Sequence, residues 1–433
     1  MKPSRYNIFL QKEGRRFVFN QLASSILEVD ESLFCCLQNE DLSLIPLNVQ
    51  NELAMSSILV DDDLNEENVV SFRVLDSRMA KSSVRVTIMP TLDCNFSCWY
   101  CYEKHKKSMM SEEAVCSILR FCESEILKPS TRNFHLDWFG GEPLLYFNEV
   151  VEPIATRIMN LCEENGVKFL HSITTNGYLI NSEMIQRLKS LKLRSYQITL
   201  DGSAQYHNKT RFSATDKNSY SAIVSNVINL CQEIEDIDMM VRINYTPKNI
   251  ISLEDIANDF PLEIRNKILL FPQLVWQFKK NINAITERIK DVLKFYKECG
   301  YKSRTDNLTV CQCYAESIAQ YAINYDLSVY KCTARDFSAN HSVGSIKNGV
   351  FLPNSHYFDY SIRSDVEKEE CRGCKLLPSC FGRCVQKRVE NSVYNCDKEA
   401  LLNSIFNNLY LYLDEHGYKG QTSHSDNGTQ QHS

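Results

Sequence analysis

The amino-acid sequence predicts an α/β protein whose centre is a barrel of alternating strands and helices, with a smaller module before it and a cysteine-rich region after it. Six strand-like segments lie between residues 84 and 278, and a helix-like segment follows each of them. Parallel neighbours in a sheet need a crossover of this length, so the six strands are predicted to form one parallel sheet. Six units, where a closed barrel of this kind has eight, indicate a partial, TIM-like (β/α)6 barrel.

The predicted strands are rich in apolar residues, and most of them end where a polar or glycine-containing loop begins. They cover residues 84–89, 134–139, 169–175, 196–200, 239–245 and 269–278. The first helix is predicted to begin after Ser111, a good N-cap, because Glu112 and Glu113 favour its first turn. The other helices are predicted over residues 148–165, 182–190, 219–234, 252–260 and 282–299.

The size and composition fit a globular protein of roughly three domains. The chain has 433 residues, of which 43% are hydrophobic and 24% are charged, and its formal net charge is −6. This mild acidity does not favour nucleic acid as a partner. No run approaches the roughly 18 apolar residues that a membrane span needs, and the N-terminus lacks the apolar core of a signal peptide. We therefore expect a cytoplasmic protein without a membrane partner.

Residues 1–83 have a different pattern from the rest of the chain. Residues 6–10 and 16–20 are predicted to form a strand pair around Gly14, and helices are predicted near 21–28, 31–38 and 48–57. The pattern indicates a small hairpin-plus-helices module with an exposed sheet edge. At the other end of the chain, residues 419–433 are polar and are predicted to be disordered.

Eighteen cysteines are the most unusual feature of the composition. In a reducing cytosol, thiols clustered at short spacing are more often metal ligands than disulfide partners. One group is compact, and a second group crowds the last third of the chain. The other cysteines are predicted to be ordinary packing residues: Cys35, Cys36, Cys116, Cys122, Cys162, Cys231 and Cys299.

The first cysteine group follows the first predicted strand. Cys94, Cys98 and Cys101 have the spacing C-x3-C-x2-C, which places three thiols on one short loop. Three soft ligands without a nearby fourth cysteine or histidine make a poor closed zinc site, since structural zinc takes four ligands. An iron–sulfur cluster with one open iron suits them better, because the open position binds a substrate or cofactor. Zinc and plain core thiols are the alternatives.

Three further motifs follow the next three predicted strands. Gly140-Gly141-Glu142-Pro143 allows close approach of the backbone and supplies one carboxylate. Asn176-Gly177 and Asp201-Gly202 follow the third and fourth strands, and ordinary turn chemistry is the alternative interpretation of both. Functional residues of such folds lie at the C-terminal ends of the strands, which is where all these motifs fall.

The cysteine loop, with a strand directly before it, resembles the signature of the radical S-adenosylmethionine (SAM) superfamily, and the resemblance covers residues 84–305. It implies that Cys94, Cys98 and Cys101 hold a 4Fe-4S cluster whose fourth iron is chelated by SAM. One electron from the cluster then cleaves SAM to methionine and a 5′-deoxyadenosyl radical. That radical abstracts a hydrogen atom from the substrate.

The same resemblance implies which residues contact SAM. The Gly-Gly-Glu-Pro motif holds the methionine amino group, Thr199 lies near the ribose, and Arg211 lies near the carboxylate, which a guanidinium binds well. Asn176 is expected to contact the SAM-binding residues and not SAM itself. The complete set of implied cofactor-binding residues is Tyr100, Gly140, Gly141, Glu142, Pro143, Asn176, Thr199, Asp201 and Arg211.

The second cysteine group on its own permits a zinc ribbon. Together with two upstream cysteines, however, it resembles the seven-cysteine SPASM pattern of radical SAM peptide-modifying enzymes, in a region that we place at residues 306–418. The seven cysteines are Cys313, Cys332, Cys371, Cys374, Cys380, Cys384 and Cys396.

The SPASM resemblance implies two auxiliary 4Fe-4S clusters, which makes three clusters in the whole chain. The ligands that it assigns to one auxiliary cluster are Cys371, Cys374, Cys380 and Cys396. The ligands that it assigns to the other are Cys313, Cys332 and Cys384. Cys311 is either a fourth ligand of this second cluster, or the cluster keeps an open iron that binds a peptide thiolate.

Two positions depart from the SPASM pattern. Leu327 stands where the family often has glycine, so this turn is predicted to be built differently. Thr333 follows Cys332, whereas sulfatase-maturing relatives have an aspartate there that accepts a proton. The second departure weakens an assignment as a formylglycine-forming enzyme.

The resemblances together imply a maturase of a ribosomally made precursor peptide, and they favour a thioether cross-link as its product. The N-terminal module resembles the recognition element to which the leader of such a peptide adds a strand. A flavodoxin or ferredoxin is the expected electron donor. Carbon–carbon cross-linking and sulfatase-type maturation are the alternatives within this class, and a zinc-ribbon binding protein is the alternative from another class.

Overall fold

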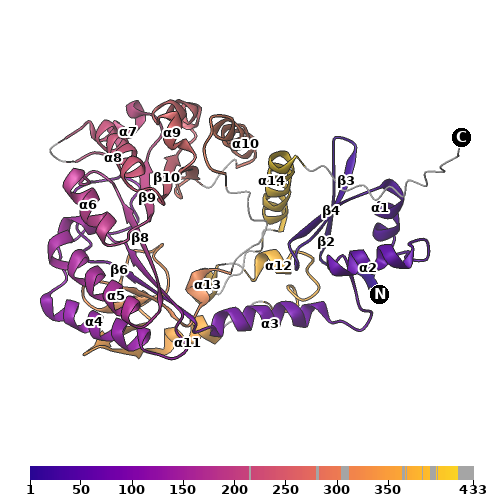
Figure 1. Cartoon of the computed structure of the whole chain (residues 1–433), viewed down its shortest axis with the longest axis horizontal. Helices are drawn as coiled ribbons and strands as arrows, with labels where there is room; N and C mark the ends of the chain where they lie inside the picture. Colours follow the sequence, from indigo (N-terminus) through magenta and orange to yellow (C-terminus); the bar gives the residue numbers. More distant parts are fainter. Residues whose placement is uncertain are drawn as a thin grey trace, which may run out of the picture.

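The computed structural model describes residues 1–213, 216–278, 282–303, 312–362, 366, 368–382, 384–390, 396 and 398–417. Figure 1 shows a strongly curved sheet whose helices cover its outer face, and a separate small sheet near the N-terminus. The long helix α3 (Glu66–Met79) runs between these two parts of the molecule. In the described part of the chain, no helix is both long enough and apolar enough to cross a membrane. The predicted tail over 419–433 lies outside the described residues.

The six predicted strands are all present and lie side by side in chain order. Each pairs in parallel with the next one, so the predicted parallel sheet is confirmed. Successive side chains of each strand point alternately to the inner face of the sheet and to its outer face, as the two-residue period of a strand requires. The outer face carries buried apolar residues. The strands are β6 (Ser83–Ile88), β7 (Asn133–Trp138), β8 (Lys168–Thr175), β9 (Ser195–Leu200), β10 (Asp238–Tyr245) and β11 (Ile268–Leu274).

The connecting helices agree with most of the predictions. The exception is the predicted helix over 252–260, which is wrong: two short 3-10 turns occupy Ile250–Ser252 and Glu254–Asn258. Pro261 follows them, and a proline disfavours helical backbone in the residue before it. The helices of this part are α4 (Glu112–Ile126), α5 (Glu152–Glu164), α6 (Ser182–Ser190), α7 (Ala204–Thr210), α8 (Ser219–Glu233), α9 (Leu262–Arg265) and α10 (Ile282–Glu298).

Four strands that the sequence did not predict extend the sheet beyond β6. The first of them, β12 (Gln320–Ile323), pairs in parallel with β6, and the others continue the sheet in antiparallel order. The sheet is therefore open, and the C-terminal region covers the edge of its first core strand. The added strands after β12 are β13 (Ser328–Tyr330), β14 (Gly344–Lys347) and β15 (Val350–Pro353).

The turn between β12 and β13 contains the first departure from the family pattern. Leu327 has a φ of +66°, the left-handed conformation that glycine adopts most easily. Its amide donates to the carbonyl of Asn324, and the Asp326 carboxylate accepts from the amide of Ser328. The expectation that this turn is built differently is wrong, because hydrogen bonds hold leucine in a conformation suited to glycine.

The N-terminal part contains a three-stranded antiparallel sheet. Strand β2 (Asn7–Lys12) pairs with β3 (Arg15–Asn20) around Gly14, and β4 (Ser25–Val29) pairs with β3. The predicted helix over 21–28 is wrong, because Asn20 accepts from two amides of the following turn and Ser24 has a φ of +53°. These contacts reverse the direction of the chain, so that the segment after the turn pairs with β3 as the strand β4.

Helices cover both faces of this small sheet. On one face lie α1 (Glu31–Gln38) and α2 (Leu47–Met55), close to the predicted ranges. On the other face lies the C-terminal helix α14 (Lys398–His416), whose Ile405, Leu409 and Leu413 pack against Ile8, Leu10 and Phe17. The two ends of the described chain therefore share one apolar core. In the described residues, no strand pairs with the outer edge of β2 or of β4.

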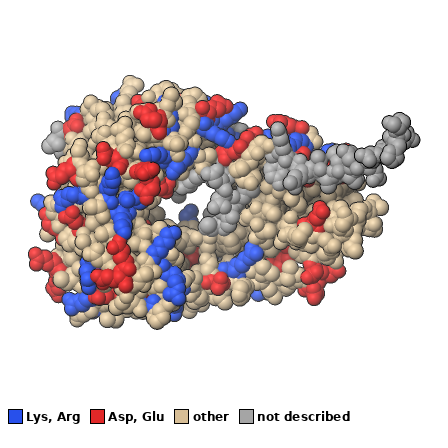
Figure 2. All heavy atoms as spheres, in the orientation of Figure 1, with Lys and Arg blue, Asp and Glu red and all other residues tan. Residues whose placement is uncertain are grey.

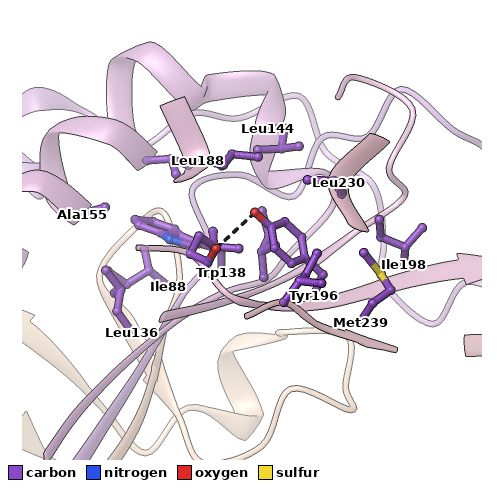
Figure 3. Close-up of a cluster of buried hydrophobic side chains, with 14 of the residues drawn as sticks. Ile88, Leu136, Trp138, Leu144, Ala155, Leu188, Tyr196, Ile198, Leu230 and Met239 are labelled. Carbon is purple, nitrogen blue, oxygen red and sulfur yellow. Dashed lines mark hydrogen bonds between the residues drawn. The ribbon is translucent and has the colours of Figure 1, made fainter. Parts of the chain in front are cut away.

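The main core lies between the large sheet and its outer helices. Figure 3 shows Trp138 and Tyr196 among aliphatic side chains of neighbouring strands and helices. The indole N–H of Trp138 donates to Nε2 of His171 at 2.7 Å, and Nδ1 of His171 lies 2.9 Å from the carbonyl of Leu191. Because an indole N–H only donates, Nε2 must accept and the imidazole is neutral. Burial lowers the pKa of His171 to about 4.

A buried ion-pair group joins the N-terminal part to the C-terminal region. Arg78 of α3 donates through Nε to a carboxylate oxygen of Glu316 at 2.7 Å, and Nη2 of Arg388 lies 3.0 Å from its other oxygen. The three side chains are at most 3% exposed. Glu316 lies close to Cys313 in the sequence, and Arg388 lies close to Cys384. The ion-pair group therefore holds two of the predicted cluster-binding segments against α3.

Acid should destabilise the fold through His171. Its pKa is about 4 in the folded state and about 6.5 when unfolded. Only the unfolded state binds the proton between these values, so this stability is present above pH 6.5 and is lost as the pH falls toward 4. We expect a loss of about 3 kcal/mol over this window, measured by urea unfolding. His171→Gln should flatten the dependence, and an unchanged slope in that variant would contradict the assignment.

Removal of the buried charge of Glu316 should destabilise the protein strongly. Glu316→Gln leaves two buried guanidinium groups without a counter-charge, so the free energy of unfolding should fall by about 3–5 kcal/mol. The control is Glu163→Gln, which breaks an exposed ion pair with Lys192 and should cost less than about 1 kcal/mol. Equal effects of the two substitutions in chemical denaturation would show that the buried group does not hold the parts together.

Candidate active site

The predicted motifs meet at one edge of the large sheet, around a cavity of about 230 Å³. The cysteine loop follows β6, the Gly-Gly-Glu-Pro motif follows β7, Asn176 follows β8 and Asp201 follows β9. All three cysteines of the loop line the cavity, together with Gly140, Gly141, Asn176, Thr199 and Arg211. The juxtaposition predicted from the C-terminal ends of parallel strands is therefore present in the structure.

The cysteine loop is held at its start by side-chain and backbone hydrogen bonds. Asp93 receives a hydrogen bond from the amide of Cys94 at 2.9 Å, and its own amide donates to Oγ1 of Thr91 at 2.8 Å. Isolated β-bridges pair Leu92 with Lys106 and Phe96 with Ser213, one before the first cysteine and one within the loop. These contacts fix the backbone that carries the three thiols.

The environment of the thiols fits a positively charged inorganic group. Burial raises the pKa of Cys94 to about 12, with the negative charge of Glu142 adding to the effect, and burial raises that of Cys101 to about 11. Buried thiols of this kind become thiolates only when a cation compensates their charge, and iron supplies it. Among the described residues, no three His, Cys, Asp or Glu side chains are grouped closely enough to hold a single metal ion.

Gly141 permits the closest contact in the site. A Cβ atom at this position would lie 2.0 Å from the carbonyl oxygen of Asp93, so no other residue fits without displacing the cysteine loop. The amide of Gly141 donates to the carbonyl of Thr91 at 3.1 Å, and that of Glu142 donates to Asp93 at 2.8 Å. The Gly-Gly turn therefore lies directly against the loop, in a cradle that a side chain would fill.

The Glu142 carboxylate is completely buried, and neutral hydrogen-bond donors from its own loop and from the end of β8 surround it. It accepts from the amide of Asn176 at 2.8 Å, from Oγ1 of Thr175 at 2.7 Å and from the amide of Leu144 at 3.1 Å. Burial raises its pKa, and these hydrogen bonds oppose that effect. Pro143, directly after it, begins a 3-10 turn. Glu142 thus ties the loop after β7 to the loop after β8.

Asn176 contacts the cysteine loop through its side-chain amide. Its Nδ2 donates to Oδ1 of Asn95 at 2.7 Å and lies 4.0 Å from Sγ of Cys94. Its Oδ1 accepts from the amide of Tyr178 at 2.9 Å, which is the Asx turn that its sequence suggests. The residue therefore serves both the turn and the site.

A second buried carboxylate, Asp201, organises the other side of the cavity. It accepts from the hydroxyl of Tyr100 at 2.6 Å and from that of Thr210 at 2.8 Å. Arg211 donates through Nη1 to the Tyr100 hydroxyl at 3.1 Å and lies 3.3 Å from Sγ of Cys98. Burial raises the pKa of Asp201, and the charge of Arg211 lowers it. Nε of Arg211 is buried and has no hydrogen-bond partner in the described structure.

Several cavity residues are absent from the sequence-based set. Seven of the residues that line the cavity were not predicted as site residues: Glu103, His105, Gln197, Arg242, Asn244, Gln273 and Trp276. Four of them occupy alternate, inward-facing positions of β9, β10 and β11, so the two-residue period of a strand is the signal that could have found them. The other three lie on loops, where a single sequence gives no comparable signal.

Three of the C-terminal cysteines lie near one another. Partial burial raises the pKa of Cys313, and the charges of Cys332 and Cys384 add to the effect. Tyr314 lies beside this group, with its hydroxyl 4.0 Å from Sγ of Cys332 and 3.1 Å from Oγ1 of Thr333. The structure thus brings together the three cysteines that were predicted to share a cluster.

Tyr102 connects this cysteine group with the cavity. Burial raises the pKa of its hydroxyl, and the charges of Cys101 and Cys332 raise it further. The same tyrosine lines the cavity, directly after the third cysteine of the loop. The two cysteine sites therefore face a common region of the molecule.

The remaining predicted ligands are distributed differently. Cys371, Cys374 and Cys380 share one short segment that packs against the N-terminal sheet and α3, where Cys371 is buried beside Tyr6, Val70 and Val74. Cys396 is exposed. Cys311 lies outside the described residues. Of the cysteines predicted to be packing residues, Cys35 and Cys116 are exposed instead, which corrects that prediction for them.

The comparisons with known proteins agree with this geometry. Residues 88–260 match the sequence model of the Radical SAM superfamily. The chain is 23% identical to the radical SAM cyclopropyl synthase TigE of Paramaledivibacter caminithermalis, over 92% of this chain and 94% of that protein. It is also 23% identical to the cysteine-type anaerobic sulfatase-maturating enzyme of Clostridium novyi, over 71% of this chain and 90% of that enzyme.

Solved structures show the same fold. Native anSMEcpe with bound AdoMet has a TM-score of 0.56 at 17% identity, over 77% of this chain and 97% of that one. Streptococcus suis SuiB has a TM-score of 0.50 at 16% identity, over 92% of this chain and 99% of that one. The sequence match, the cysteine loop and the glycine cradle lead to one assignment: residues 88–260 form a radical SAM domain, and the chain is a radical SAM enzyme.

Proposed function

We propose that this enzyme modifies a ribosomally made precursor peptide and joins two of its residues through a thioether. The observation that carries the proposal is Tyr102, which lines the cavity directly after the cysteine loop and interacts electrostatically with Cys332 of the C-terminal cysteine group. Formation of a carbon–sulfur bond from a C–H and an S–H group removes one hydrogen atom, one proton and one electron. A second iron–sulfur centre near the cavity is suited to accept that electron.

The cysteine loop would hold the first 4Fe-4S cluster through Cys94, Cys98 and Cys101. When bound, this cluster and SAM supply the 5′-deoxyadenosyl radical that removes the hydrogen atom. The chain's own residues would position SAM: Gly140 and Gly141 line the cavity for its methionine part, Thr199 lines it for the ribose, and the Arg211 guanidinium lines it for the carboxylate.

We assign two auxiliary 4Fe-4S clusters to a SPASM domain over 306–418, after a radical SAM core over 84–305. Cys313, Cys332 and Cys384 hold one of them, with Cys311 or an open iron completing the set. The other is held by Cys371, Cys374, Cys380 and Cys396. The proximity of the first three thiols supports this division, and so does the short segment that contains Cys371, Cys374 and Cys380.

The N-terminal module over 1–83 is proposed to bind the leader of the peptide. The outer edges of β2 and β4 are unpaired in the described residues, and an extended peptide adds to such an edge through main-chain hydrogen bonds. One structure of the related fold, anSMEcpe, holds a peptide together with AdoMet. A flavodoxin or ferredoxin in the cytoplasm would supply the electrons.

Carbon–carbon bond formation is the second candidate. The similarity to a cyclopropyl synthase, which extends over 92% of this chain, favours it. Sulfatase-type maturation has less support, because Thr333 pairs with Tyr314 at the position where those relatives have a proton-accepting aspartate. The zinc-ribbon binding protein is excluded as an interpretation of the whole chain by the radical SAM domain.

Metal analysis should separate the three cluster sites. Protein isolated without oxygen should contain about twelve iron atoms per chain with matching sulfide, and the Cys94/Cys98/Cys101→Ala variant should contain about eight. The variant should form no 5′-deoxyadenosine, because the auxiliary sites alone do not bind SAM productively. Zinc in place of iron, or full SAM cleavage by the variant, would overturn the assignment.

The mass of the product should identify the reaction. A peptide cross-linked through a thioether loses two hydrogen atoms and keeps its cysteine sulfur, whereas conversion of cysteine to formylglycine removes the sulfur. High-resolution mass spectrometry with alkylation of free thiols distinguishes these results. A product that has lost two hydrogen atoms but still reacts with the alkylating agent would instead favour the carbon–carbon reaction.

A further inference from the structure

The wall of the cavity opposite the cysteine loop carries an arginine that none of the assigned roles uses. Arg242 lies on β10, at the level of Thr199 on β9, and both side chains point to the inner face of the sheet. Gln197 of β9 and Gln273 of β11 line the same wall. The resemblance places the SAM ribose next to Thr199, so Arg242 lies beside the region where a substrate must present its reacting carbon.

The side chain of Arg242 is held in place from one side only. Its Nε donates to Oδ1 of Asn244 at 3.0 Å, and Asn244 in turn hydrogen-bonds to the buried Asp201. No other hydrogen bond or ion pair of Arg242 is present in the described part of the chain. The guanidinium is therefore oriented through Nε by a buried network, and the side chain lines the cavity, which is the arrangement of a prepared anion site.

The surroundings of Arg242 favour a carboxylate over other anions. Gln197 on β9 and Gln273 on β11 line the same wall from the two neighbouring strands, and the planar fork of the guanidinium matches the two oxygens of a carboxylate. The amide of Gln273 donates to the carbonyl of Leu274 at 3.3 Å and keeps a second N–H group. The acidic residue of the cavity, Glu103, forms no ion pair with Arg242 among the described residues.

Arg242 lines the same cavity as Cys94, Cys98 and Cys101 of the cysteine loop. A ligand bound by Arg242 therefore shares the cavity with the proposed source of the radical. This is where the residue to be modified has to be held.

We propose that Arg242, assisted by Gln197 and Gln273, binds a carboxylate that fixes the peptide in the cavity, so that the preferred substrate carries an aspartate or glutamate next to the modified residue. The inference rests on the proposed function and names the chemistry of its substrate. The same chemistry has a second source, the carboxylate of SAM itself, and the experiment distinguishes the two.

The test compares binding of two capped tripeptides, Ac-Ala-Asp-Ala-NH2 and Ac-Ala-Asn-Ala-NH2, to the cluster-loaded enzyme with SAM present. Isothermal titration calorimetry measures both affinities, and a separate titration measures the affinity for SAM. The parent enzyme should bind the aspartate peptide about tenfold more tightly. Arg242→Gln should abolish this preference, and Arg242→Lys should keep part of it, since lysine retains the charge without the fork.

Arg85 provides a matched control on the same face of the sheet. Its guanidinium is already paired with Asp137 at 2.9 Å, so Arg85→Gln should leave the preference between the peptides at the parent value. Iron content must be the same in all variants, which shows that the clusters are intact.

Each outcome decides the proposal. Loss of the aspartate preference in Arg242→Gln with unchanged SAM affinity assigns the site to the substrate. A fall in SAM affinity of about tenfold, without a peptide preference in the parent, assigns it to SAM. If Arg242→Gln changes neither quantity, the carboxylate site does not exist. Because these readouts are binding constants, they stand apart from failure of the proposed function, which would appear as absence of any modified peptide.

Discussion

The active-site loops of this protein depend on two buried carboxylates. Glu142 joins the loops after β7 and β8, and Asp201 joins the cysteine loop to β10 and α7. A buried carboxylate is costly unless donors surround it, so each one fixes the geometry of every group that satisfies it. The thiols, the Gly-Gly turn and the cavity-facing arginines are positioned by this requirement. The cofactor then has to fit a cavity whose shape is already determined.

The main sheet was predictable because its signals are local. Each core strand is an apolar run bounded by loop residues, and the distinctive motifs mark the C-terminal ends of β6, β7, β8 and β9. The strands β12 to β15 have only three or four residues each, and only their pairing with β6 and with one another makes them strands. The apolar residues of β4 fit the period of a helix as well as that of a strand, so the sequence predicts a helix there. The turn after Asn20 reverses the chain, and the segment forms a strand instead.

The candidate site was predictable where a motif has fixed spacing. The sequence identified the three cysteines of the loop, the Gly-Gly turn, and Tyr100, Asp201 and Arg211, but not Thr210 and Asn244, which also contact Asp201. It did not identify Arg242, because many polar residues occupy alternate strand positions, and only the fold shows which of them face the cavity. The proximity of Cys332 to Tyr102 depends on contacts between residues more than two hundred positions apart, which no local pattern encodes.

The pairing of β12 with β6 also affects how such enzymes diversify. The strand that leads into the cysteine loop has its free edge covered by the cysteine-rich region, and α14 returns to cover the N-terminal sheet. A chain assembled by exchanging one region for that of a relative would expose an unpaired strand edge or an apolar sheet face, both of which promote aggregation. Recombination should therefore yield a folded protein only when the N-terminal module, the core of the large sheet and the cysteine-rich region are exchanged together. These three parts are then inherited as one unit, although each has its own task.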